Sequence, residues 1–207
     1  MKKTLLALLC LVSASASAKI VDSPHPYVPS FGIDPDLPLN RVTWLTTHNA
    51  FHHETGLTVF PNQRHSIREQ LGLGVRGLML DLHPRDDGLH LCHVHCIGGE
   101  PTFAAVLRET ILPFLRATPF TVLTIHLEDN ENREQLIAEL SRVEGLAGVT
   151  FDPDAWDTPE WPTYRQLIVS GQLLLIFTQR DANSGRLATP SGPVHVMYDQ
   201  DYTVENY

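Results

Sequence analysis

Val75-Arg-Gly-Leu-Met-Leu-Asp-Leu-His83 is an apolar run that ends in a carboxylate and an imidazole. Its alternation is typical of a β-strand, with Met79, Asp81 and His83 on one face and three leucines on the other. Three other apolar runs have the same form: residues 42–47 lead to His48-Asn49, residues 89–92 to His93, and residues 121–127 to Glu128. Polar side chains at successive strand ends are expected where the carboxyl ends of parallel strands carry a site.

The elements around this run alternate along the chain. We predict strands at 41–47, 75–83, 89–93, 122–127 and 173–177, with a weaker sixth at 194–198. Helices are predicted at 66–71, 102–116, 131–143 and 164–169, the first with Ser66 and Glu69 at capping-box spacing. Such alternation predicts an α/β fold with a largely parallel sheet. A TIM-type (β/α) barrel has eight strands and typically about 250 residues. With six predicted strands in 207 residues, we expect a TIM-type barrel that is incomplete at its C-terminus.

Residues 1–18 have the pattern of a signal peptide. Lys2-Lys3 is a positive start, residues 5–12 are apolar, and Ala16-Ser-Ala18 is a small-residue cleavage site. An uncleaved membrane anchor is the alternative, but the apolar run is too short to span a bilayer comfortably. We therefore expect a secreted or periplasmic protein with one domain at residues 19–207.

The chain is acidic. Its 15 basic and 24 acidic residues give a net charge of −9, and loss of the leader with its two lysines makes this two units more negative. Such a charge disfavours non-specific binding to nucleic acid and to anionic membranes. A phosphate ligand must then be held by a few aimed groups or by a cation. We expect a monomer that makes at most transient contact with a membrane surface.

Two cysteines remain once Cys10 leaves with the leader. In a secreted protein, Cys92 and Cys96 favour a disulfide, because free thiols are a liability outside the cell. A metal site with Cys-x3-Cys spacing is the alternative, and two cysteines alone make it the weaker one.

Two histidines at strand ends could form an acid–base pair. Imidazole takes up or releases a proton near neutral pH, so His48 is a candidate general base and His93 a candidate general acid. Across a phosphodiester, such a pair removes the proton of an attacking hydroxyl and protonates the leaving oxygen. The simpler interpretation is that each histidine merely ends a strand.

Asn49, Asp81 and Glu128 place three oxygen donors at three strand ends. Hard cations such as Ca²⁺ prefer this type of ligand, and a bound cation would offset charge on a phosphate. The alternative is that the carboxylates are solvated or paired with arginine.

Three further residues invite interpretation. His93-Val-His95 would put two imidazoles on one strand face, as in a zinc site, although no further histidine has convincing spacing. Arg85, in the turn after residues 75–83, is a candidate phosphate contact, against the simpler interpretation as a solvated turn residue. His83 is a second candidate substrate contact.

Taken in order, these residues resemble a known family. Thr47-His48-Asn49, Gln70-Leu71 with Gly74–Asp81, Leu91-Cys-His93 and Leu127-Glu128 look like the X domain of phosphatidylinositol-specific phospholipases C. Still more closely, they look like the secreted PLC-like phosphodiesterases, which have a TIM-type barrel. The likeness covers residues 39–207, with Trp161-Pro-Thr, Gly171–Thr178 and Tyr202–Asn206 also similar.

The resemblance implies that the inositol 2-hydroxyl displaces diacylglycerol and gives a cyclic inositol phosphate, with His48 as base and His93 as acid. In the calcium-dependent branch, Asn49, Asp81 and Glu128 match the ion's ligands, but Met79 stands in place of a glutamate. In the calcium-independent branch an arginine replaces the ion, and His83 occupies that position here. The favoured hypothesis is a secreted phosphodiesterase acting on a phosphodiester or phospholipid, with Ca²⁺ as its expected cofactor. A zinc hydrolase using His93 and His95, and a non-catalytic barrel that binds phosphate esters, are the alternatives.

Overall fold

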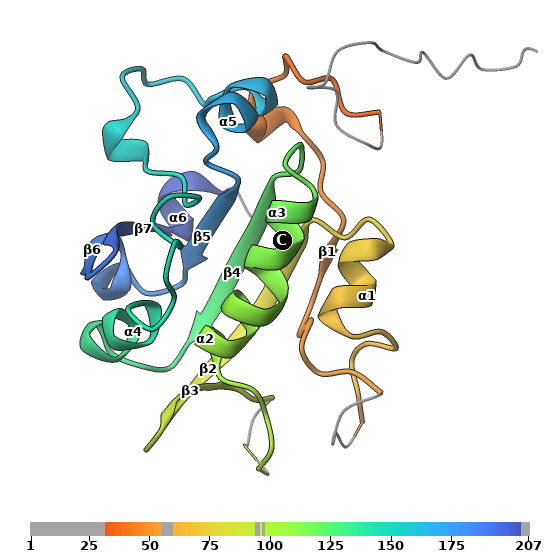
Figure 1. The fold of residues 1–207 in the computed structure, drawn as a ribbon, viewed down its shortest axis with the longest axis vertical. Helices are drawn as coiled ribbons and strands as arrows, with labels where there is room; N and C mark the ends of the chain where they lie inside the picture. The colour runs from red at the N-terminus through yellow and green to blue at the C-terminus, as the bar shows by residue number, and fades with distance from the viewer. Residues whose placement is uncertain (1–31, 55–59, 94–95, 97, 204–207) are drawn as a thin grey trace, which may run out of the picture.

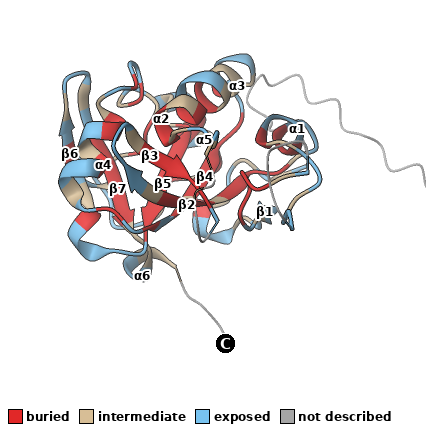
Figure 2. Ribbon diagram, turned by 90° about the horizontal axis from the view of Figure 1, so that it is seen from below, coloured by how far each residue is buried: buried red, intermediate tan, exposed pale blue. Residues whose placement is uncertain are grey.

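The structure, a computed structural model, describes residues 32–54, 60–93, 96 and 98–203. The predicted signal peptide at residues 1–18 lies outside the described residues. The described chain has a mixed α/β fold in which one curled sheet resembles half of a barrel, as Figures 1 and 2 show. The complete barrel is therefore not seen.

Seven strands form this sheet. They are β1 (Thr46–Thr47), β2 (Gly77–Arg85), β3 (Gly88–Leu91), β4 (Leu123–Asp129), β5 (Leu174–Thr178), β6 (Gly185–Thr189) and β7 (Gly192–Tyr198). Their order is β1-β2-β4-β5-β7-β6, and β3 pairs with β2 outside this path. The pairs along β1-β2-β4-β5-β7 are parallel, whereas β3 and β6 run antiparallel to β2 and β7.

Helices lie between the strands along the chain, and one follows the last strand. They are α1 (Ile67–Gly72), α2 (Phe103–Val106), the π-helix η2 (Leu107–Ile111), α3 (Leu112–Ala117), α4 (Arg133–Leu140), α5 (Tyr164–Ser170) and α6 (Asp199–Tyr202). Short 3₁₀ turns are η1 (Leu39–Arg41), η3 (Pro153–Ala155) and η4 (Asp181–Asn183). The α2–α3 segment lies across β2 and β4 on one face of the sheet (Figure 1).

The leucines of β2 form the centre of the core. Leu78, Leu80 and Leu82 have no exposed surface, whereas Met79 and His83 on the opposite face are partly exposed. Figure 2 shows β2, β4 and β5 largely in the buried class. Since side chains alternate along a strand, burying the leucines fixes Asp81 on the other, concave face of the sheet.

Capping boxes determine where three of the helices begin. Ser66 accepts from the backbone N–H of Glu69, and the Glu69 carboxylate accepts from the Ser66 N–H, as the sequence predicted. Asn132 and Thr163 begin α4 and α5 in the same way. Each box satisfies two backbone donors that a helix end would otherwise leave unpaired.

Several elements differ from the prediction. The first strand spans two residues instead of seven, and β3 is antiparallel to β2. The hairpin partner β6 was not predicted, because its alternation is masked by Gly185, Arg186 and Thr189. The helix predicted at 102–116 contains a π-turn just before Pro113. Proline has no N–H to donate, so the change in hydrogen bonding falls where one donor is missing in any case.

Candidate active site

The candidate active site lies where β1, β2 and β4 end. Asp81 on β2 and Glu128 on β4 are register partners, so their carboxylates lie side by side on adjacent strands. His48 and Asn49 follow directly after β1. Since β3 turns back along β2, the N–H of Cys92 donates to the Asp81 backbone oxygen at 3.3 Å, and His93 comes next in the chain. The fold thus brings four separate segments of the chain to one end of the sheet.

Asn49 connects Asp81 to His93. In the amide orientation that satisfies both ends, its nitrogen donates to the two Asp81 carboxylate oxygens at 2.8 and 3.2 Å. Its oxygen then accepts from His93 Nε2 at 3.2 Å. Asn49 is only 1% exposed and has a φ of 47°, a left-handed backbone that asparagine tolerates better than most residues.

Both predicted catalytic histidines are accessible to solvent. His48 and His93 are both exposed. The backbone oxygen of His48 accepts from Gln63 Nε2 at 2.6 Å, which holds the loop at that residue. Because His48 adjoins Asn49 in the chain and Asn49 contacts His93, the two histidines belong to the same end of the sheet.

His52 lies beside His93, although the sequence analysis did not single it out as a site residue. It is 8% exposed, and its ring centroid lies 5.1 Å from that of His93. Its Nδ1 is 2.7 Å from Asn62 Oδ1, which fixes the ring. The only signal in the sequence was its position four residues after His48.

The electrostatics of the site suit a cation. Burial raises the pKa of Asp81 to about 7, and the neighbouring charge of Glu128 adds to the shift. Two adjacent carboxylates and one amide are hard oxygen donors, and the cost of ionising Asp81 is what a bound cation would offset. Met79 contributes no further oxygen, because its thioether occupies the next position of the same strand face.

A disulfide closes the loop that begins with His93. Cys92 and Cys96 are bonded with a Cα–Cα distance of 5.1 Å, the pairing that the sequence favoured. Cys92 is 1% exposed, so one end of this short loop is anchored in the core. The position of His93 is therefore restricted on one side by β3 and on the other by the disulfide.

The remaining predicted residues lie further out. His83 is partly exposed and pairs in register with His90 of β3. The guanidinium of Arg85 is 3.8 Å from Glu100, with 41% of its side chain exposed. His95, the second residue of the predicted zinc pair, lies outside the described residues.

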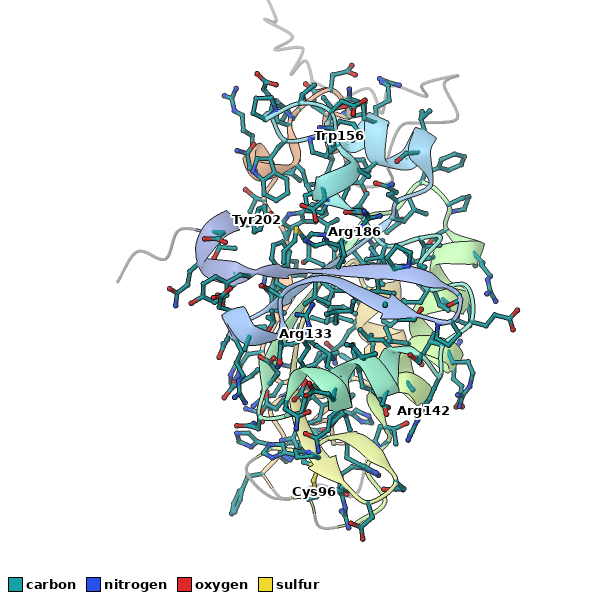
Figure 3. All side chains as sticks on the ribbon, turned by 90° about the vertical axis from the view of Figure 1, so that its left-hand side faces the viewer. Cys96, Arg133, Arg142, Trp156, Arg186 and Tyr202 are labelled. Carbon is teal, nitrogen blue, oxygen red and sulfur yellow. A yellow bond between two sulfur atoms is a disulfide. The ribbon has the colours of Figure 1, made fainter. Side chains whose placement is uncertain are left out.

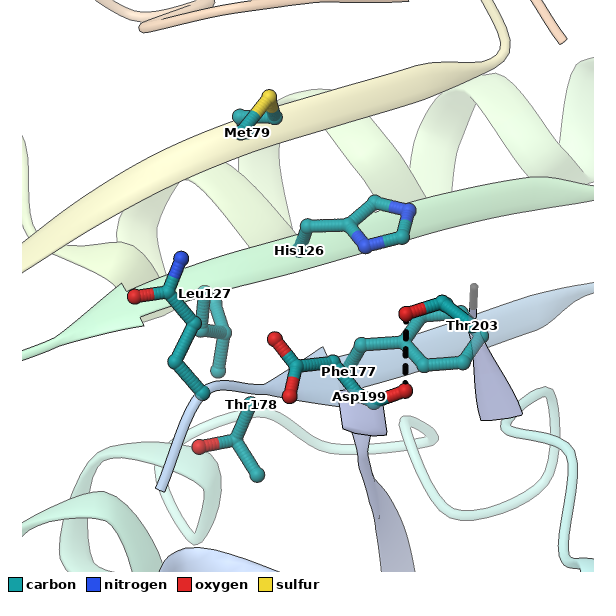
Figure 4. Close-up of a pocket in the computed structure, with 8 residues that line it drawn as sticks. Met79, His126, Leu127, Phe177, Thr178, Asp199 and Thr203 are labelled. Carbon is teal, nitrogen blue, oxygen red and sulfur yellow. Dashed lines mark hydrogen bonds between the residues drawn. The ribbon is translucent and has the colours of Figure 1, made fainter. Parts of the chain in front are cut away.

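A cavity of about 150 Å³ lies on the concave face of the same strands. Met79, His126 and Phe177 are register partners two positions before the row that holds Asp81 and Glu128. The rings of His126 and Phe177 stack at 4.7 Å, and burial lowers the pKa of His126, which favours its neutral form. The cavity is lined by Met79, His126, Leu127, Phe177, Thr178, Gln179, Asp199 and Thr203 (Figure 4).

A second polar cluster lies elsewhere. His195 of β7 has its Nδ1 3.1 Å from Asp152 Oδ1 and 3.5 Å from Asp154 Oδ2. Arg186 pairs with the other Asp152 oxygen at 3.0 Å. Figure 3 shows Arg186 and Trp156 far from Cys96, so this cluster does not belong to the candidate active site. Asp152 thus contacts both His195 and Arg186.

Among the described residues, no helix has the length and apolar character that crossing a membrane requires.

Comparisons with known proteins agree with this architecture. The family model PI-PLC X, described as "PI-PLC X 1", matches residues 38–206. A PI-PLC X domain-containing protein of Arabidopsis thaliana is 32% identical over 184 residues, covering 82% of this chain and 41% of the relative. "PI-PLC X domain-containing protein 1" of Arthroderma benhamiae is 30% identical over 129 residues, covering 60% and 42%. The chain thus spans about two fifths of the length of these relatives.

The fold has a solved counterpart. Phosphatidylinositol-specific phospholipase C from Listeria monocytogenes superposes with a TM-score of 0.58, covering 81% of this chain and 61% of that one. Its sequence is 18% identical, so this likeness bears on the fold alone. The match over residues 38–206 carries the classification, and the chain belongs to the PI-PLC X domain family.

Proposed function

We propose that this domain cleaves a phosphodiester by general acid–base catalysis. His48 removes the proton of an attacking hydroxyl, whose oxygen forms a new bond to phosphorus. The bond from phosphorus to the leaving oxygen breaks, and His93 gives that oxygen a proton. The observation that carries the proposal is the Asn49 amide, whose nitrogen donates to Asp81 and whose oxygen accepts from His93 Nε2 at 3.2 Å.

The proposed substrate is a phosphatidylinositol or a related glycerophosphodiester. With this substrate the attacking group is the inositol 2-hydroxyl, and the product is a cyclic inositol phosphate. Family membership supports the substrate class. The concave, partly aromatic cavity beside Asp81 and Glu128 offers room for part of a head group. His83 and Arg85 are proposed to contact the substrate at the outer edge.

Ca²⁺ is the proposed cofactor, held by Asn49, Asp81 and Glu128. Bound there, it supplies positive charge beside the phosphoryl oxygens. The chain would offer the carboxylates of Asp81 and Glu128 on adjacent strands. Asn49 would join them with its amide turned over, so that its oxygen and not its nitrogen faces Asp81. With Met79 in place of a further carboxylate, we expect weaker calcium binding than a site with three carboxylates would have.

We further propose that the protein is secreted and that its sheet belongs to a TIM-type barrel. The leader pattern at residues 1–18 supports secretion. A relative from Arthroderma benhamiae, 24% identical over 152 residues, is named an uncharacterized secreted protein.

The experiment is a turnover assay on phosphatidylinositol in mixed micelles, with ³¹P NMR to detect the cyclic product. His48→Ala and His93→Ala are expected to lower kcat by about 10²- to 10⁴-fold with unchanged circular dichroism. His65→Ala, at an exposed histidine just before α1, is the matched control and should keep its activity. Wild-type protein that binds phosphate esters without turnover would overturn the proposal in favour of a non-catalytic domain.

A further inference from the structure

The backbone that carries His48 and Asn49 needs support from outside its own strand. The strand β1 has only two residues, and Asn49 adopts a left-handed φ of 47° although it is not a glycine. Such a conformation persists when surrounding contacts over-determine it. The contacts therefore identify which residues hold the site in place.

Gln70 provides three of these contacts. Its Oε1 accepts from Thr47 Oγ1 at 2.6 Å, and its Nε2 donates to the backbone oxygens of Ala50 at 2.7 Å and His65 at 2.6 Å. Thr47 precedes His48, and Ala50 follows Asn49. The Gln70 side chain thus forms hydrogen bonds with the residue before His48 and the residue after Asn49.

The support is itself rigid. Gln70 lies on the buried face of α1, with 3% of its surface exposed, between the buried residues Ile67 and Leu71. Its backbone oxygen accepts from the N–H of Val75 at 3.0 Å, which ties α1 to the start of β2. The N–H of Ala50 donates to the Met79 oxygen on β2 at 3.0 Å. Helix, strand and catalytic turn therefore form one hydrogen-bonded unit.

A primary amide is suited to this place. The Gln70 amide donates two hydrogen bonds through Nε2 and accepts one through Oε1. Both of its N–H donors are therefore satisfied. A carboxylate at this position would leave the buried Ala50 oxygen without a donor, and an apolar side chain would leave all three partners unpaired.

We propose that Gln70 is a positioning residue for the reaction, because it sets the direction of His48 and the amide plane of Asn49. This inference rests on the proposed function of the site. Displacing a catalytic group by about 1 Å can cost about 10²-fold in rate. Gln70 touches no reacting atom in this scheme and acts only through the turn at residues 47–50.

The test compares Gln70→Met with Tyr164→Phe. Methionine keeps the length of the side chain and removes the three hydrogen bonds. The Tyr164 hydroxyl accepts from the Val122 N–H at 3.0 Å, so Tyr164→Phe removes a buried hydrogen bond away from the site. We expect Gln70→Met to lower kcat by about 10- to 100-fold with KM changed less than threefold. Tyr164→Phe should lose thermal stability and keep kcat within twofold.

Thr47→Val is the milder variant if Gln70→Met does not fold. It removes only the bond to Gln70 Oε1 and should lower kcat by a smaller factor, about three- to tenfold. If kcat stays within twofold in Thr47→Val, or falls in Gln70→Met and Tyr164→Phe alike, Gln70 is merely structural and the inference is overturned.

A second readout separates this inference from the proposed function. The side-chain amide of Asn49 gives ¹H–¹⁵N signals that report its bonds to Asp81 and His93 without any substrate. These signals should shift in Gln70→Met and Thr47→Val and stay in place in Tyr164→Phe. Such shifts in a protein without turnover would support the positioning role while the proposed function failed, and unchanged signals would overturn the positioning role alone.

Discussion

Neighbouring acids of β4 have different environments because side chains alternate along a strand. Glu128 faces the concave side and is exposed, whereas Asp129 faces the helices and is 7% exposed. Asp129 Oδ2 accepts from Thr178 Oγ1 at 2.7 Å and from Asn183 Nδ2 at 2.5 Å. One residue thus serves the candidate site and the next holds two loops together behind it.

The buried carboxyl of Glu131 makes the stability of the protein depend on pH. It is 1% exposed, and burial raises the pKa of its carboxyl to about 8, an effect that nearby backbone N–H groups offset only in part. The pKa of Glu131 in the folded state lies above its usual value of 4.5. The contribution of this one group to stability is therefore most favourable below about pH 4.5. Stability is then lost as the pH rises toward 8.

Glu131→Gln should remove this loss. We expect the variant to be more stable than the wild type at pH 9, by on the order of 2–4 kcal/mol since each pKa unit is worth about 1.4 kcal/mol. The difference should shrink as the pH falls to 5. Urea unfolding at pH 5, 7 and 9 measures it, and parallel pH profiles of the two proteins would contradict the prediction.

At the level of residues, the sequence predicted the polar residues at the strand ends and missed the residues whose contacts support them. His48, Asn49, Asp81 and Glu128 could be named because strand alternation and chain order alone place them. The roles of Gln70 and His52 depend on contacts made by residues 47–52 and 62–65. No periodic pattern describes those contacts.

Among the elements, β1 and β2 approach one another closely at Gly77. An ideal Cβ at Gly77 would lie 2.2 Å from Thr46 Oγ1 and 2.9 Å from Thr46 Cβ, on the register partner. Only glycine allows the two strands to approach in this way. This pairing positions the turn with His48.

Gly77→Ala should therefore destabilise the protein by about 1–3 kcal/mol and reduce activity, since the added methyl group forces β1 outward. Gly72→Ala is the control, because a Cβ there meets no atom within 4 Å in α1. It should leave activity intact and stabilise the fold by about 0.5–1 kcal/mol. Thermal unfolding and turnover of both variants test the claim, which equal stabilities would contradict.

The disulfide after β3 gives a further prediction at this scale. Cys92→Ser with Cys96→Ser should cost about 2 kcal/mol, the loop-entropy value for a ring of about five residues. Activity should fall as well, because His93 lies within the ring. Reductant should affect wild-type turnover in the same direction and leave the double variant unchanged. If reductant also changed turnover of the double variant, its effect on the wild type could not be assigned to the Cys92–Cys96 bond.

How well elements were predicted depended on their local signals. The helix from Tyr164 to Ser170 and the Ser66 capping box have strong sequence patterns and were found. The first strand was predicted too long, since residues 41–45 have β-prone side chains but no partner strand along most of their length. The antiparallel direction of β3 follows from the two-residue turn Asp86-Asp87 between β2 and β3, because parallel strands require a much longer connection.

For the whole chain, the net charge is −9, and it is two units more negative without the leader, which opposes approach to an anionic lipid surface. An anionic surface repels an acidic protein, and salt screens this repulsion over a Debye length of about 8–10 Å at physiological ionic strength. We expect turnover on vesicles rich in anionic lipid to rise as NaCl is increased from about 10 to 150 mM. Turnover of a short-chain, monomeric substrate measures the control and should change little. A fall with salt on vesicles would contradict this view.

Because the carboxylates of Asp81 and Glu128 lie side by side, thermal unfolding can measure which metal ions the protein binds. The two carboxylates repel one another in the folded form, which brings them together, and a cation bound between them would relieve that repulsion. Because such a cation binds the folded form and not the unfolded chain, it would raise the melting midpoint. A hundredfold excess over Kd is worth about 2.7 kcal/mol. A dye-based melting screen across a panel of chloride salts would rank the metals by preference before a single substrate had been synthesised.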